Sequence, residues 1–311
     1  MPYPPIRRIG PSCIVLALLL AGTAGPAVAE QSARMGPERA WQQLERGKLA
    51  LRSKAVLVVD EAGNTLYARS AETPMPIASL TKLMTAMVIL DAGLPLDERI
   101  EIDRADRDLV KLTGSRLEVG ARLTRRELLV LALMASENRA AAALARTYPG
   151  GDEAFVKAMN ARAGALGMRH TRFSDAAGLD PGNVASAEDL GRLVLAAMEY
   201  PLVREASTRR SLEVRPYKRR GPLRFGNTNR LLRNANWDIQ LSKTGYINEA
   251  GRCLVMHAEL DKEPIVLVLL NSFGKLTPFG DANRVRSWLA QNADRIRPSS
   301  ARASGDASPP G

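Results

Sequence analysis

Cysteine and histidine are scarce in this 311-residue chain, which contains two of each. Cys13 lies in a segment that is typical of a cleavable signal, so only Cys253 would remain and no intramolecular disulfide could form. With only His170 and His257 present, a Ser-His-Asp triad is implausible, and no zinc-finger spacing occurs. The mature domain must therefore be stabilised by core packing, and any nucleophile must be activated by another base.

The chain also lacks an apolar run near its N-terminus that is long enough to span a bilayer. The apolar residues 14–21 follow Arg7 and Arg8 and precede Ala27-Val28-Ala29, a small-x-small site. This order predicts a signal peptide at residues 1–29, cleaved near Ala29. We therefore expect export to the periplasm and release, with no stable membrane anchor.

Acidic residues are outnumbered by basic ones, 33 to 44, which gives a formal net charge of +11. Loss of the two signal arginines lowers this value by two, to +9. A positive chain suits an anionic polymer, such as cell-wall material or a membrane surface. Nucleic acid is disfavoured by export and by the absence of an RNA-binding signature or aromatic-basic interleaving. The basic residues are scattered, so we interpret most of them as solvated surface.

One domain is expected between two polar ends. Residues 30–49 are polar and Arg-rich and are expected to form a flexible leader. Residues 294–311 have the Pro, Ser, Ala and Gly composition of a disordered tail. Residues 50–293 contain no internal repeat or interdomain linker, so they are expected to form one folded domain.

Within this domain the apolar pattern changes between strand-like and helix-like periods. Two apolar segments around the turn 61–64 predict a β-hairpin. A capping box at 124–127 predicts the start of an apolar helix. Residues 209–236 are basic and rich in turn signals, and are expected to be irregular. The other expected elements are helices at 152–163, 186–200 (ending at Pro201) and 285–290, and strands at 239–245, 252–260 and 264–270.

The apolar run 77–90 carries a serine and a lysine three residues apart, Ser79 and Lys82. In a helix this spacing places both side chains on one face. A helix that is apolar on nearly all sides is normally buried, so its polar residues need a reason to be there. A hydroxyl beside an amine can form an activated nucleophile. S-x-x-K is a frequent tetrapeptide, however, and predicts little alone.

Two further motifs follow in order, 57 and then 107 residues along the chain. The triplet Ser-Glu-Asn at 136–138 lies between two apolar helices and, taken alone, favours a capped turn over a functional site. The triplet Lys-Thr-Gly at 243–245 lies on a predicted strand. S-x-x-K, an S-D-N-type triplet and K-T-G together are the motif set of β-lactamases and penicillin-binding proteins. Their contexts suit a site where a sheet meets helices.

On these motifs, residues 50–293 resemble the low-molecular-mass penicillin-binding proteins, the serine D-Ala-D-Ala peptidases. The stretch 242–254, SKTGYINEAGRCL, is most similar to the penicillin-binding protein 7 type of D-alanyl-D-alanine endopeptidase. The middle triplet matches only the outer residues of S-x-N, a variation that the family tolerates. The resemblance implies an α+β fold of the β-lactamase/transpeptidase type, with a mainly antiparallel five-stranded sheet, flanking helices and an all-helical subregion. Carboxypeptidase relatives carry a second β-rich domain and an amphipathic anchor, for which this chain ends too soon.

The resemblance also implies a role for each motif residue. Ser79 is expected to attack a D-Ala carbonyl and form an acyl-enzyme. Lys82 is expected to be its base, with a pKa lowered by burial and by a second cation, Lys243. Ser136 would relay a proton to the leaving amine, and no metal or cofactor is needed. The residues expected to bind substrate are Asn138, Lys243, Thr244 and Gly245, and the backbone N–H groups of Ser79 and Tyr246 are expected to stabilise the oxyanion.

The expected function is that of a periplasmic D,D-endopeptidase that cleaves D-Ala–meso-diaminopimelate cross-links in peptidoglycan and is acylated by β-lactams. A D,D-carboxypeptidase that removes terminal D-Ala would use the same residues. A β-lactamase is disfavoured, because no positioned glutamate motif lies between the second and third motifs. A non-catalytic β-lactam sensor or wall-binding module belongs to another class, and a sensor usually needs a transmembrane segment.

Overall fold

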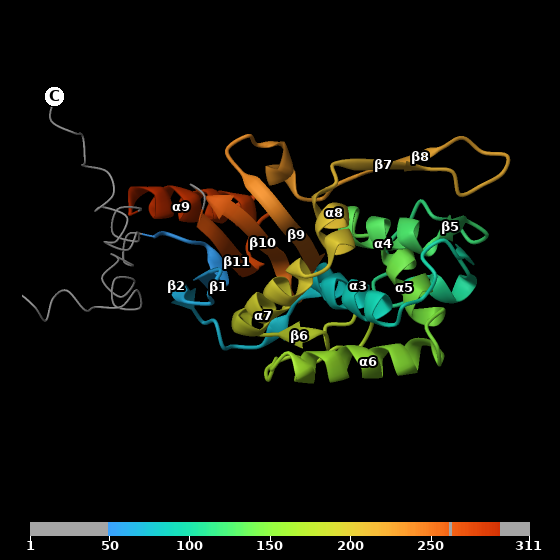
Figure 1. Ribbon diagram of the computed structural model, residues 1–311, viewed down its shortest axis with the longest axis horizontal. Coiled ribbons are helices and arrows are strands. Elements are labelled where there is room, and N and C mark those ends of the chain that lie inside the picture. The colour runs from blue at the N-terminus through green and yellow to red at the C-terminus, as the bar shows by residue number, and fades with distance from the viewer. Residues whose placement is uncertain (1–48, 261–262, 293–311) are drawn as a thin grey trace, which may run out of the picture. The chain divides into compact units, whose positions relative to one another are not determined.

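The computed structural model describes residues 49–260 and 263–292. The predicted signal peptide, the leader up to residue 48 and the tail from residue 294 lie outside the described residues. Within them the chain folds around a five-stranded antiparallel sheet with the strand order β2-β1-β11-β10-β9 (Figure 1). In the described ranges no helix has both the length and the apolar character needed to cross a membrane.

The sheet combines strands from both ends of the domain. The predicted hairpin is confirmed, and Gly63 adopts a φ of 84° in its turn. The first strand pairs with the last, with Ala55 opposite Leu270 and Asp60 opposite Ile265. The five strands are β1 (Ser53–Asp60), β2 (Thr65–Arg69), β9 (Asp238–Ile247), β10 (Gly251–Leu260) and β11 (Glu263–Ser272).

In the inner strands β1, β11 and β10, successive side chains point to opposite faces of the sheet and pack into two separate hydrophobic cores. Leu57, Val255 and Val268 belong to the larger core, which includes the helical region, whereas their sequence neighbours on the other face belong to the smaller core. Helix α9 (Thr277–Gln291) contacts β1, β10 and β11 and supplies Trp288 to the smaller core. Because both faces are covered, β10 and β11 each have six consecutive buried residues, 253–258 and 265–270, without the alternation of a half-exposed strand.

The segment between β2 and β9 is mainly helical. Helix α3 lies at its centre, and eight of its ten residues are buried. The α+β prediction with a five-stranded antiparallel sheet is confirmed. The helices of this segment are α3 (Lys82–Asp91), α4 (Arg125–Met134), α5 (Asn138–Arg146), α6 (Gly151–Ala165), α7 (Ala187–Met198) and α8 (Pro201–Thr208). Short strand pairs join β3 (Met75–Pro76) to β6 (Val184–Ala185), and β4 (Arg99–Glu101) to β5 (Arg122–Thr124).

Three local predictions were wrong. Helix α7 ends at Met198, and Pro201 begins α8, because proline fits the first turn of a helix. The segment predicted to be irregular contains the antiparallel pair β7 (Ser211–Val214) and β8 (Leu223–Gly226) and the 3₁₀ turn η5 (Arg230–Arg233). Helix α9 begins at Thr277 and not at residue 285, with Pro278 in its first turn.

A buried carboxylate joins the start of β1 to α9. Asp281 is fully buried and accepts hydrogen bonds from the backbone N–H groups of Arg52 (3.0 Å) and Ser53 (2.7 Å) and from the Ser53 hydroxyl (2.6 Å). Arg284 Nη2 lies 2.5 Å from the same carboxylate. This cluster fixes the first strand of the domain to its last helix.

Candidate active site

Ser79 lies in a 3₁₀ turn, η3 (Ala78–Thr81), that leads directly into α3. The predicted helix therefore begins at Lys82, but the turn still brings Ser79 Oγ to 2.9 Å from Lys82 Nζ. Ala78 adopts a left-handed φ of 50°. Gly178 packs against this turn so closely that a Cβ atom there would lie 1.9 Å from the Ala78 carbonyl oxygen.

Lys82 is fully buried, and its Nζ contacts three oxygen atoms. These are Ser79 Oγ at 2.9 Å, Asn138 Oδ1 at 2.8 Å and the Ala177 carbonyl oxygen at 2.6 Å. Burial lowers the pKa of Lys82 to about 8, and the carboxylates of Asp175, Glu137 and Asp108 oppose this shift. A substantial fraction of Lys82 is therefore neutral near pH 8 and able to accept a proton.

Lys243 on β9 is buried beside Ser136. Its Nζ lies 2.8 Å from Ser136 Oγ and 2.8 Å from the Thr244 carbonyl oxygen. Burial, and then the charge of Lys82, lower the pKa of Lys243 well below its usual value. Burial is the largest cause of the lowered pKa at both lysines, and the repulsion between the two amines opposes their simultaneous protonation. The expected lowering by burial is therefore confirmed, and the share that Lys243 contributes at Lys82 stays a prediction.

The middle triplet forms both a capped turn and a wall of the site. Glu137 is the N-cap of α5, since its carboxylate accepts the N–H of Arg139. Ser136 adopts a left-handed φ of 58°. Because the cap is provided by the central residue, the side chains of Ser136 and Asn138 remain available to Lys243 and Lys82.

Strand β9 is an edge of the five-stranded sheet and passes next to the serine turn. A Cβ atom at Gly245 would lie 2.9 Å from the Ile77 carbonyl oxygen and 3.2 Å from the Ser79 backbone nitrogen. Only glycine permits this approach, which brings the backbone on either side of Gly245 close to Ser79. Thr244 Oγ1 lies 2.6 Å from Thr228 Oγ1, and the guanidinium of Arg252 stacks 3.6 Å from the ring centre of Tyr246.

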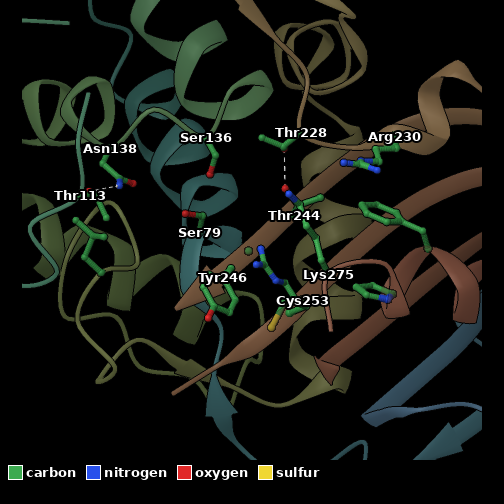
Figure 2. A pocket seen from close by; sticks show the side chains of 15 residues that line it. Ser79, Thr113, Ser136, Asn138, Thr228, Arg230, Thr244, Tyr246, Cys253 and Lys275 are labelled. Atoms are coloured by element: carbon green, nitrogen blue, oxygen red, sulfur yellow. Dashed lines mark hydrogen bonds between the residues drawn. The ribbon is translucent and has the colours of Figure 1, made fainter. Parts of the chain in front are cut away.

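A pocket of about 400 Å³ is lined by side chains from all three motifs, among them Ser79, Ser136, Asn138 and Thr244 (Figure 2). Sequence analysis missed several further lining residues, because they belong to no motif. They are Thr113, Thr228, Arg230 and Lys275. Arg230 and Lys275 line it on the Thr244 side, away from Asn138. Neither histidine is among the described residues that line this pocket.

Comparison with known proteins gives consistent matches over most of the chain. Residues 42–274 match a protein family described as D-alanyl-D-alanine carboxypeptidase. A Pseudomonas aeruginosa protein named D-alanyl-D-alanine endopeptidase is 49% identical over 254 residues, which cover 81% of this chain and 82% of that protein. An Escherichia coli protein of the same name is 46% identical, covering 76% and 77%. The crystal structure of the Streptomyces K15 DD-transpeptidase matches with a TM-score of 0.71 and 27% identity, over 77% of this chain and 97% of that one.

Proposed function

The chain belongs to the D-alanyl-D-alanine carboxypeptidase family of serine D,D-peptidases, and from this premise we propose that it hydrolyses peptidoglycan cross-links through an acyl-enzyme on Ser79. The observation that carries the proposal is the 2.9 Å contact between Ser79 Oγ and the buried amine of Lys82. A serine next to an amine with a lowered pKa is an activated nucleophile.

In the first half of the reaction, neutral Lys82 takes the proton of Ser79 while Ser79 Oγ bonds to the carbonyl carbon of D-Ala. The backbone N–H groups of Ser79 and Tyr246, on the two segments that meet at Gly245, stabilise the negative oxygen. The C–N bond then breaks, and the Ser136 hydroxyl, held by Lys243, relays to the leaving amine the proton that Lys82 took from Ser79, which leaves Lys82 neutral again. Water releases the acyl group in the second half, with Lys82 again as base.

Binding of the substrate is assigned to the pocket's donors. One Asn138 N–H and the Thr244 hydroxyl are placed to bind peptide amide and carboxylate groups. Arg230 and Lys275 make the Thr244 side of the pocket positive, which suits an anion. β-Lactams carry both a reactive amide and a carboxylate, so the same groups suit them as covalent inhibitors.

The preferred bond is the cross-link between D-Ala and meso-diaminopimelate. The relatives at 49% and 46% identity are both named endopeptidases, which supports this choice. Terminal D-Ala and cross-linked diaminopimelate both present a carboxylate next to the leaving nitrogen, so the cationic side chains suit either. Carboxypeptidase activity is therefore the second candidate, favoured by the description of the family.

The site of action proposed here is the periplasm. Residues 1–29 would direct export and be removed near Ala29, and residues 50–293 would form the peptidase domain.

Two defined muropeptides distinguish the candidates. One is a pentapeptide monomer, and the other is a dimer cross-linked through D-Ala and meso-diaminopimelate. Mature enzyme should convert the dimer to monomers on chromatography, and Ser79→Ala should leave it intact and lose covalent labelling by penicillin. Loss of D-Ala from the monomer alone would replace the endopeptidase with the carboxypeptidase, and penicillin labelling of Ser79→Ala would refute the nucleophile.

A further inference from the structure

The loop between η4 (Arg104–Asp106) and β5 carries Thr113 to the pocket, beside Asn138. Asp108 organises this loop. Its Oδ1 accepts the N–H groups of Val110 (2.9 Å) and Lys111 (2.8 Å), and its Oδ2 accepts the N–H (2.9 Å) and the hydroxyl (2.6 Å) of Thr113. Neither Asp108 nor Thr113 belongs to a motif, and no role in the mechanism above falls to either.

These contacts give the Thr113 hydroxyl a fixed direction. An ionised carboxylate only accepts hydrogen bonds, so the hydroxyl proton of Thr113 must point to Asp108. Although partial burial opposes it, the hydrogen bonds from Thr113, Lys111 and Val110 hold the pKa of Asp108 below its usual value, which keeps the carboxylate ionised. The Thr113 oxygen is thereby left as an acceptor, and it accepts Asn138 Nδ2 at 2.9 Å.

The orientation of the Asn138 amide in turn decides which of its atoms faces Lys82. Because Asn138 Nδ2 is engaged by Thr113, the opposite end of the amide, Oδ1, faces Lys82 Nζ at 2.8 Å. A neutral amine has two N–H donors and one lone pair. Asn138 Oδ1 and the Ala177 carbonyl oxygen are both acceptors and take the two N–H groups. The lone pair then faces the third partner, the hydroxyl of Ser79.

The reversed amide would have the opposite effect. If Asn138 turned its NH₂ group toward Lys82, that group would donate to the lone pair and compete with the proton of Ser79. The base would then be occupied in the ground state.

We propose that Thr113, oriented by Asp108, is a positioning residue that holds the Asn138 amide in the one orientation in which the Lys82 lone pair faces Ser79. The proposal rests on the function proposed above, in which Lys82 is the base.

The loop is also attached to both sides of the pocket. Lys111 Nζ lies 2.5 Å from Glu249 Oε1 after β9, and Ser115 Oγ lies 2.6 Å from Glu137 Oε1 in the middle triplet. Neither these two contacts nor the hydrogen bonds from the backbone N–H groups to Asp108 involve the Thr113 hydroxyl. A change from threonine to valine therefore removes the hydroxyl and leaves the loop in place.

The test measures the rate constant of acylation by a fluorescent penicillin between pH 5 and pH 9. The rate constant should rise with pH to a plateau. Thr113→Val should lower this plateau about tenfold, the loss expected when one hydrogen bond no longer orients the base. The pH of half-maximal rate should move down, because the reversed amide no longer stabilises the protonated amine. Thr113→Ser keeps the hydroxyl and should retain the wild-type plateau and pH profile.

Thr228→Val is the matched control, since Thr228 lines the same pocket but bonds to Thr244. Its pH of half-maximal rate should not move. Asp108→Asn provides a second route if the valine variant folds poorly. Its readout is a lower plateau, because loss of the Asp108 charge lowers the pKa of Lys82 by itself. An unchanged plateau and pH profile in Thr113→Val, or an unchanged plateau in Asp108→Asn, would overturn the inference, and so would failure of Thr113→Ser to retain activity. Absence of acylation in the wild-type enzyme would instead refute the proposed function.

Discussion

At the scale of single residues, the proposed chemistry depends on an amine that is kept from water. Lys82 is fully buried, and three carboxylates raise its pKa against the larger effect of burial. The resulting pKa of about 8 is low enough for a base, and the amine is mostly protonated at neutral pH and increasingly neutral above it. The proposed mechanism thus has a base without using histidine.

The acylation rate should therefore depend on pH with a defined sign. Below pH 8 Lys82 gains a proton and loses its lone pair, so the rate constant for penicillin acylation should fall as the pH falls, by about tenfold per unit well below the pKa. Above about pH 8 it should level off. Lys82→Arg stays protonated and should be unreactive throughout. A wild-type rate that is constant between pH 6 and pH 9 would contradict Lys82 as the base.

At the scale of elements, the spacing of the motif residues predicted which side chains meet, because each motif lies in a locally determined context. Ser79 and Lys82 needed only three residues of helical or 3₁₀ geometry to come together. The capping box at Thr124 was predicted correctly for the same reason, since both partners lie within one turn.

Other parts of the site could not be predicted, because distant segments create them. Thr113, Arg230 and Lys275 are ordinary polar residues in sequence, and only the packing of three separate segments places them at one pocket. Similarly, the pair β7–β8 is stabilised by cross-strand contacts within a basic, turn-rich segment whose composition indicates a loop. The role of Pro201 was ambiguous, because proline both ends helices and begins them.

The packing of the serine turn against the Gly178 loop leads to a prediction at this scale. Gly178→Ala would place its Cβ atom 1.9 Å from the Ala78 carbonyl oxygen, so the turn that carries Ser79 must move. We expect a loss of stability of about 2–4 kcal/mol and a loss of acylation of at least about tenfold. Gly63→Ala is the matched control, with a similar φ of 84° but no atom within 4 Å. It should lower the free energy of unfolding by only about 1 kcal/mol and leave the acylation rate unchanged. Equal effects of the two substitutions on acylation would contradict this account.

At the scale of the whole domain, the Asp281 cluster joins the first strand to the last helix. Asp281→Asn should lower the free energy of unfolding by about 3 kcal/mol, because an amide cannot replace a buried carboxylate that accepts several hydrogen bonds. For a domain of this size, the melting temperature should fall by about 6–12 °C.

An exposed pair provides the control for this prediction. Glu118 and Arg220 form a 2.6 Å ion pair in which both side chains are exposed, and Glu118→Gln should leave the melting temperature nearly unchanged. Melting curves of the two variants measure the difference. Similar melting temperatures would show that Asp281 does not hold the ends of the domain together. Acylation of folded Asp281→Asn should match that of the wild type, since Asp281 takes no part in the reaction.

Folding of this domain has to wait for its last strand. Ser53 and Ser272 face each other across β1 and β11 although they are 219 residues apart in the chain. While the chain is being synthesised, β1 has only β2 as a neighbour, and a two-stranded hairpin is marginally stable in water. Pairing over such a distance is also slow. The five-stranded sheet therefore stays incomplete until almost all of the polypeptide has been made, because β11 joins β1 to β10.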